Sequence, residues 1–152
     1  MKRGFEFLNY HIAKSLDGKI EHVGDLFNDN NLWENVPTSR GIYIICSNDT
    51  KFKYPKGESK IMYIGMSSNI RRRLKSHYKH YLEAKDDWNR CEIWISNKYN
   101  YMKAFGADVF FIKTTGNENE KYLESRALEG FYDRYYAIPV GNGAKSFRKS
   151  KD

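Results

Sequence analysis

The chain has 152 residues, which is enough for one domain with a buried core and too few for two independent domains. Hydrophobic residues make up 40% of the chain and aromatic residues 16%, a content that excludes an intrinsically disordered protein. The formal net charge of +7 predicts a surface that attracts polyanions, and the basic residues crowd segments 71–80 and 145–151.

The two cysteines, Cys46 and Cys91, form no CxxC motif, so we expect no structural zinc site. Because Cys46 lies in an apolar run, we expect a free thiol that packs as a small hydrophobe in a reducing compartment. The N-terminus lacks the long apolar run of a signal peptide, and no segment is long enough to span a bilayer. These features predict a cytoplasmic protein.

Residues 1–40 predict a helical extension. Apolar residues recur there at near-helical spacing until Asp17-Gly18, namely Phe5, Leu8, Ile12 and Leu16. A second short helical segment is expected around residues 25–33, and Pro37 ends it.

Two strands and a helix follow. Residues 41–46 and 60–66 predict antiparallel strands, joined by a polar loop over 47–59 that contains Pro55 and Gly57. Ser67 or Ser68 is the expected N-cap of the next helix. One face of this helix is expected to pack on the sheet, and it carries Ile70, Leu74, His77 and Tyr81.

The rest of the chain completes a small α+β domain. We expect a short strand at 91–95, a helix at 98–105, a buried strand at 108–113, a long helix at 118–136 and a frayed tail. The predicted fold is a three-stranded, mostly antiparallel sheet flanked by helices. Its expected parts are the extension 1–40, a domain 41–142 and a basic tail 143–152.

Three features in chain order carry the functional information. They are Gly41-Ile42-Tyr43, Tyr63-Ile64-Gly65 and Arg73, ten residues after the second tyrosine. This set resembles the GIY-YIG nuclease family, metal-dependent enzymes that cut phosphodiester bonds. The resemblance covers residues 41–142, and it implies the α+β fold described above.

The resemblance also implies roles for individual side chains. A tyrosine is the general base in this family, and the sequence leaves open whether Tyr43 or Tyr63 takes this role. Arg73 matches the arginine that contacts the scissile phosphate. His77, one turn later, matches a position where some members carry a histidine that supports the phosphate or the tyrosine.

The metal ligand is expected on the last helix. Glu124 interrupts an apolar stripe, and a carboxylate on a packed face is costly unless a cation meets it there. Glu129 lies on a face with Arg126 and Asp133 that reads as exposed. We therefore favour Glu124 over Glu129 as the ligand of Mg²⁺ or Mn²⁺.

Asn142 is the candidate for an asparagine that many members carry a dozen or so residues after the glutamate. It lies 18 residues after Glu124 and 13 after Glu129, so the usual spacing keeps Glu129 as an alternative. Asn142 can equally be a turn residue between Gly141 and Gly143. Both interpretations stay open at this point.

Nucleic acid is the expected partner. Arg71, Arg72, Lys75 and His80 are candidates for phosphate contacts. For Arg71 and Arg72 we favour a solvated basic face over a catalytic role, although they can still steer phosphates. DNA, double-stranded or branched, is implied by the resemblance alone. The extension can help select a target, alone or in a homodimer.

Two other classes of function compete with an endonuclease. Met66 stands where many family members carry a lysine, and the glutamate–asparagine spacing is irregular. Both departures motivate a catalytically inactive, nucleic-acid-binding module with the same fold. A structural or protein-interaction domain is the third class.

Overall fold

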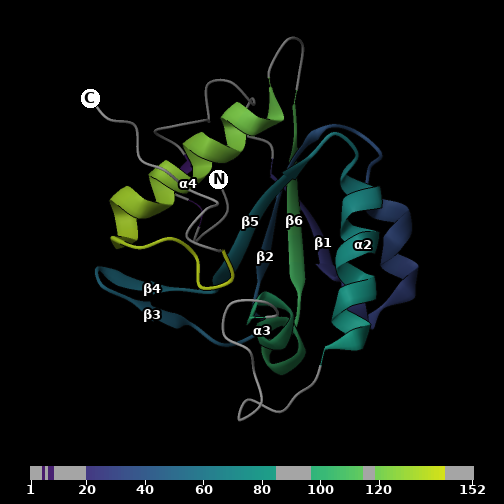
Figure 1. The fold of residues 1–152 in the computed structure, drawn as a ribbon, viewed down its shortest axis with the longest axis horizontal. Coiled ribbons are helices and arrows are strands. Elements are labelled where there is room, and N and C mark those ends of the chain that lie inside the picture. The colour runs from purple at the N-terminus through teal and green to yellow at the C-terminus, as the bar shows by residue number, and fades with distance from the viewer. Residues whose placement is uncertain (1–4, 6, 9–19, 85–96, 115–118, 143–152) are drawn as a thin grey trace.

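A four-stranded antiparallel sheet forms the centre of the molecule (Figure 1). The computed structural model describes residues 5, 7–8, 20–84, 97–114 and 119–142. The strand order is β1-β6-β2-β5, with β1 at Glu21–Asp25, β2 at Gly41–Cys46, β5 at Ile61–Ser67 and β6 at Asp108–Lys113. The α+β class is confirmed, but the expectation of three strands is wrong.

The additional strand, β1, comes from the N-terminal extension. It pairs with β6 and includes an irregularity between His22 and Gly24. Gly24 has φ of +118°, a conformation that residues with a Cβ rarely adopt. Only Val23 is buried in this short polar segment, so the sequence gives little strand signal. The sheet therefore includes residues that precede position 41.

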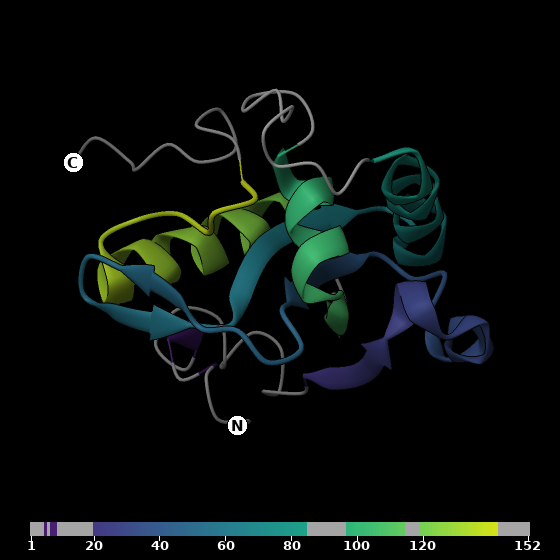
Figure 2. The ribbon, with the colours of Figure 1, turned by 90° about the horizontal axis from the view of Figure 1, so that it is seen from below.

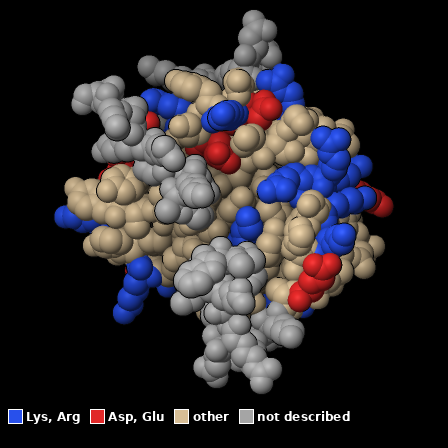
Figure 3. Space-filling model, in the orientation of Figure 1, with Lys and Arg blue, Asp and Glu red and all other residues tan. Residues whose placement is uncertain are grey.

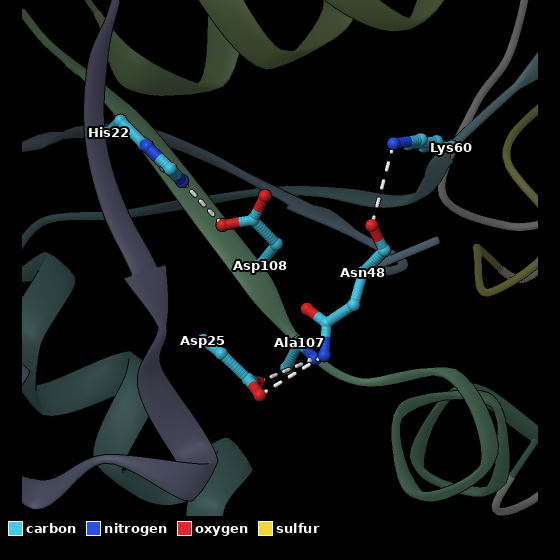
Figure 4. Close-up of polar contacts among 6 residues, drawn as sticks. All are labelled: His22, Asp25, Asn48, Lys60, Ala107 and Asp108. Atoms are coloured by element: carbon cyan, nitrogen blue, oxygen red, sulfur yellow. Dashed lines mark hydrogen bonds and ion pairs between the residues drawn. The ribbon is translucent and has the colours of Figure 1, made fainter. Parts of the chain in front are cut away.

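A junction of polar contacts holds β1 against β6 (Figure 4). The Asp25 carboxylate accepts hydrogen bonds from the Ala107 backbone N–H at 3.2 Å and from Asn48 Nδ2 at 3.1 Å. Farther along the strands, His22 Nε2 lies 2.5 Å from Asp108 Oδ1. Because these bonds join segments far apart in the sequence, they fix the extension to the sheet.

The helices cover both faces of the sheet. Helices α2 (Ile70–Glu83) and α3 (Asn97–Phe105) pack on one face, and α4 (Glu120–Tyr135) packs on the other. Helix α3 contacts α2, and both ribbon views show α2 and α4 well apart from each other (Figures 1 and 2). The helices expected near these bounds are thus confirmed. Within the part of the chain that the structure describes, no helix is long and apolar enough to cross a membrane.

Several other expectations can be compared with the structure. The helical segment expected around residues 25–33 is present as two 3-10 helices, η1 (Leu26–Asn28) and η2 (Asn30–Asn35). The expected loop over 47–59 instead contains a hairpin, with β3 at Phe52–Tyr54 and β4 at Gly57–Ser59. Most of the expected helix over 5–16, the strand at 91–95 and the tail 143–152 lie outside the described residues. The described part of the extension holds a strand and 3-10 helices rather than an α-helix.

The sheet has a hydrophobic core on each face, and successive residues of β2 point alternately into one core and the other. All six residues of this strand are buried, as expected for a strand covered on both faces. Ile42, Ile44 and Cys46 belong to the core beneath α4, and Cys46 is a free, buried cysteine as expected. Tyr43 and Ile45 belong to the core beneath α2 and α3. The first motif tyrosine therefore faces α2.

Helix α2 starts at a different cap from the one expected. The Asn69 side chain accepts a hydrogen bond from Arg72 N at 3.0 Å, so Asn69 is the N-cap rather than Ser67 or Ser68. Ser67 lies before the helix and does not cap it, because its hydroxyl donates to the Asn69 carbonyl at 2.9 Å. The predicted apolar face is confirmed, because Ile70, Leu74, His77 and Tyr81 are all buried.

Asp25 is expected to be a key residue for docking of the extension. Asp25→Ala leaves the Ala107 N–H without its acceptor and should lower the free energy of unfolding by about 2 kcal/mol. Glu34→Ala, which removes an exposed carboxylate from the same segment, should change it by less than about 0.5 kcal/mol. Urea denaturation of both variants measures the difference, and equal effects would show that the junction contributes nothing specific.

Candidate nuclease site

The two motif tyrosines approach each other closely because residue 65, which lies next to both rings on the same face of the sheet, is a glycine. Tyr43 pairs directly with Gly65 across β2 and β5, and Tyr63 is the diagonal neighbour on the same face. A Cβ on Gly65 would lie 2.5 Å from Tyr43 Cζ and 2.8 Å from Tyr63 Cε1. The absent side chain lets the two rings approach to 6.0 Å between centroids.

His77 connects the first tyrosine to α3. Its Nε2 is hydrogen-bonded to Tyr43 Oη at 2.7 Å, and its Nδ1 to Tyr99 Oη at 2.9 Å. Burial, followed by the charge of Arg73, lowers the pKa of His77 to about 3, so the ring is neutral near pH 7. A neutral imidazole has one donor and one acceptor nitrogen, so one phenol donates to the ring and the other accepts from it.

The electrostatic surroundings of the two motif phenols differ. Burial raises the pKa of Tyr43 well above its usual range, and the charge of Arg73 opposes this. Burial also raises the pKa of Tyr63, Arg73 lowers it, and the carboxylate of Glu124 raises it further. Tyr63 is therefore the phenol on which both the cation of α2 and the carboxylate of α4 act.

Arg73 lies at the centre of this group of tyrosines although its side chain is exposed. Burial lowers the pKa of Arg73, but the phenols of Tyr43, Tyr63 and Tyr99 outweigh it and raise the value. A cation surrounded by aromatic hydroxyls and open to solvent can contact an external anion. Its place beside both tyrosines fits the role that the sequence predicts for it.

Glu124 lies half-buried on α4 and has no hydrogen-bond or ion-pair partner among the described residues. Burial raises its pKa to about 7, and the charge of Lys121 partly opposes this effect. Glu129 is also partly buried, so the expectation that it lies on an exposed face is wrong. Its charge is not among the main ones that affect the pKa of Tyr43 or Tyr63. The charge of Glu124 therefore acts on Tyr63, which favours Glu124 over Glu129 as the carboxylate of the site.

Asn142 anchors the edge strand β5. Its Oδ1 accepts from the Ile64 N–H at 3.0 Å, and its Nδ2 donates to the Ile64 carbonyl at 2.9 Å. Next to it, the Gly141 N–H donates to the Met62 carbonyl at 2.6 Å. The side chain thus holds the backbone between Tyr63 and Gly65, and Asn142 also lies in a turn, since its N–H donates to the Pro139 carbonyl. This arrangement is that of a positioning residue.

The structure adds two residues that the sequence reasoning missed, Lys98 and Tyr99 at the start of α3. Tyr99 bonds His77, and Lys98 Nζ lies 4.9 Å from the centroid of the Tyr63 ring. Neither belongs to a motif or to an apolar stripe. A lysine next to a tyrosine is ordinary in sequence, so only the fold reveals their position.

The basic residues of α2 differ in how they are used. Arg71 Nε donates to the Val36 carbonyl at 2.7 Å and fastens the extension to the helix. Lys75 is exposed with its Nζ 5.8 Å from the Trp33 ring centroid, and exposed His80 lies 3.7 Å from Glu83. Arg72 is exposed. The space-filling view shows lysine and arginine side chains gathered over α2 (Figure 3). This surface is therefore positively charged and can attract an anion.

The donor set is compatible with a magnesium-like ion, although it is small. Among the described residues, no group of three or more His, Cys, Asp or Glu side chains converges. Glu124 is nevertheless a half-buried carboxylate that has no ion-pair partner among the residues the structure describes. Mg²⁺ commonly binds through one or two carboxylates together with water and substrate phosphate oxygens. A carboxylate of this kind therefore fits such an ion and would not suit a zinc cage.

Comparisons of the chain with models of known protein families, with curated proteins and with solved structures found no match in any of the three. The functional interpretation consequently depends on the motif residues and on their geometry.

The contact between Gly65 and Tyr43 predicts a test by double mutation. Gly65→Ala should cost about 1–3 kcal/mol of stability, because the new methyl group overlaps both tyrosine rings. Tyr43→Leu removes the two closest atoms that the methyl group meets and leaves only its contact with Tyr63, so the double variant should lose less than the sum of the single losses. Denaturant titrations give the coupling energy, and strictly additive losses would exclude the close contact as the cause.

Glu124 predicts an unusual dependence of stability on pH. Its folded pKa, about 7, lies above the ordinary value of 4.5, so its favourable contribution is complete below pH 4.5 and is lost as pH rises to 7. Glu124→Gln should therefore raise the free energy of unfolding at pH 8 by on the order of 1 kcal/mol, allowing for solvent contact, and change it little at pH 4. Denaturation at both pH values, with Glu129→Gln for comparison, measures this, and equal gains for both variants would contradict the assignment.

Proposed function

We propose that this protein is a metal-dependent endonuclease of the GIY-YIG type that hydrolyses phosphodiester bonds in DNA. The observation that carries the proposal is the surroundings of Tyr63. Its phenol lies next to Tyr43 and feels the charges of Arg73 from α2 and Glu124 from α4. A phenol, a guanidinium and a carboxylate at one point are the groups that phosphodiester hydrolysis requires.

Each side chain has a distinct task in the proposed reaction. Arg73 binds the scissile phosphate and stabilises the negative charge that builds on its oxygens. Tyr63 accepts the proton of the attacking water, because it faces both the cation and the carboxylate. Tyr43 is only 1% exposed and is hydrogen-bonded to His77. We therefore assign it the role of positioning Tyr63 rather than contacting the substrate.

Glu124 holds the divalent ion, Mg²⁺ or Mn²⁺. When bound, such an ion supplies positive charge next to the phosphate and favours ionisation of nearby groups. The free protein keeps Tyr63 protonated at neutral pH, since burial raises its pKa. Ionised Glu124 is also required, so both groups favour higher activity above pH 7 than below it.

DNA is proposed as the substrate because the motif resemblance implies it and because α2 offers exposed cations around Arg73. Arg72, Lys75 and His80 lie on this helix with their side chains exposed. Such charges bind phosphates without regard to sequence and make affinity dependent on salt. Arg71 is assigned to folding instead, because its side chain holds the extension.

Incubation with supercoiled plasmid tests the proposal directly. Wild-type protein with Mg²⁺ should nick or linearise the plasmid, and EDTA should prevent this. Arg73→Ala should lower the rate about 10²- to 10³-fold by removing charge stabilisation, and Glu124→Ala should abolish metal-dependent cleavage. Glu129→Ala, on the same helix, is the matched control and should cleave like wild type.

Two outcomes would contradict this assignment. Cleavage by Glu124→Ala together with loss of cleavage in Glu129→Ala would move the metal ligand to the other carboxylate. Salt-sensitive DNA binding by wild-type protein, with no product in any divalent metal, would identify a binding module without turnover. Circular dichroism spectra of all variants establish that they are folded.

A further inference from the structure

Lys98 is a half-buried cation in the first turn of α3 that the proposed reaction does not yet use. Its Nζ lies 4.9 Å from the Tyr63 ring centroid and 5.4 Å from the Tyr99 ring centroid. Both distances are within the range of cation–π contacts. The ammonium group therefore lies against the tyrosine that we propose as the base.

Lys98 and Arg73 are close enough to affect each other. Burial lowers the pKa of Lys98, and the positive charge of Arg73 lowers it further. Neither cation has a carboxylate partner within the described residues. Glu124 forms no ion pair with either cation among the described residues, and the charge that lowers its pKa is that of Lys121.

Two cations that act on the same tyrosine and have no carboxylate partner among the described residues repel each other and gain from a bound anion. Apart from Glu124, whose charge acts on Tyr63, the other groups at this point are phenols and a neutral imidazole, which carry no opposing charge. A phosphate diester is an anion with two free oxygens that can accept from both side chains. The arrangement thus has the charge and the donors to bind one phosphate group.

The fold holds Lys98 in place. A Cβ on Gly141 would lie 3.1 Å from Lys98 Cβ, so the start of α3 packs closely on this turn. The same turn is bonded to β5 through the Met62 carbonyl and through Asn142. Since Tyr63 lies between these two bonded positions of β5, Lys98 and Tyr63 share one rigid support, which reduces the cost of ordering them around a ligand.

We propose that Lys98 and Arg73 together bind one phosphate of the nucleic-acid backbone next to Tyr63, with Lys98 as a phosphate-binding residue of the site. This inference rests on the proposed nuclease function and adds a residue from α3, outside both tyrosine motifs. Lys98 increases the positive charge that the phosphate meets where its negative charge grows during hydrolysis.

Kinetics of Lys98→Met on plasmid DNA with Mg²⁺ test this proposal. Methionine keeps much of the volume and removes the charge, so kcat should fall about 10- to 100-fold, and Lys98→Arg should recover part of the loss. Lys103→Met is the matched control, because Lys103 is on the same helix with its Nζ 4.6 Å from the Tyr81 ring centroid. This control should remain within about twofold of wild type.

A second measurement separates this proposal from the nuclease function. Binding of inorganic phosphate to metal-free protein, followed by calorimetry, should weaken at least about fivefold in Lys98→Met and remain unchanged in Lys103→Met. If wild type cleaves DNA and Lys98→Met cleaves equally well, the role of Lys98 is overturned while the nuclease stands. If wild type does not cleave, phosphate binding decides the question. Weaker phosphate binding in Lys98→Met but not in Lys103→Met supports the two-cation site, and equal phosphate binding in Lys98→Met and wild type overturns it.

Discussion

The site depends on the contact of the Tyr43 ring with the backbone of Gly65. Because the two residues are opposite each other in an antiparallel pair, Tyr43 must lie over whatever occupies position 65. Only glycine leaves room for the ring, since any Cβ would lie 2.5 Å from its hydroxyl. The hydroxyl can then reach His77, and Tyr63 can lie beside it. One missing side chain therefore determines the geometry of three aromatic groups.

The place of β5 in the sheet explains how separate elements reach the same point. As an edge strand it contacts α2 and α3 on one face of the sheet and α4 on the other. The turn that contains Gly141 and Asn142 bonds this free edge and prevents pairing with another chain. Cations from α2 and α3 and the carboxylate of α4 consequently act on Tyr63, the central residue of the site.

The sequence predicted those features that depend on local periodicity or on residue identity. The stripe that includes Leu74 and His77, the strands of the two tyrosine motifs and the half-buried position of Glu124 are examples. It could not predict β1, whose pairing depends on Asp25 contacts with residues far along the chain. It also could not predict that Asn142 bonds Ile64 or that α3 brings Lys98 to Tyr63, because long-range packing determines both.

The electrostatics of the site connect its stability with its proposed chemistry. Burial keeps the imidazole of His77 neutral and moves the pKa of Glu124 to about 7, so negative charge is scarce near neutral pH. The guanidinium of Arg73 remains charged, and Lys98 adds to it. Such an excess of positive charge is unfavourable in the free protein and becomes favourable when a phosphate binds. In the proposed reaction, the same groups that cost stability in the free protein supply affinity for an anion, as is common where perturbed pKa values gather at functional sites.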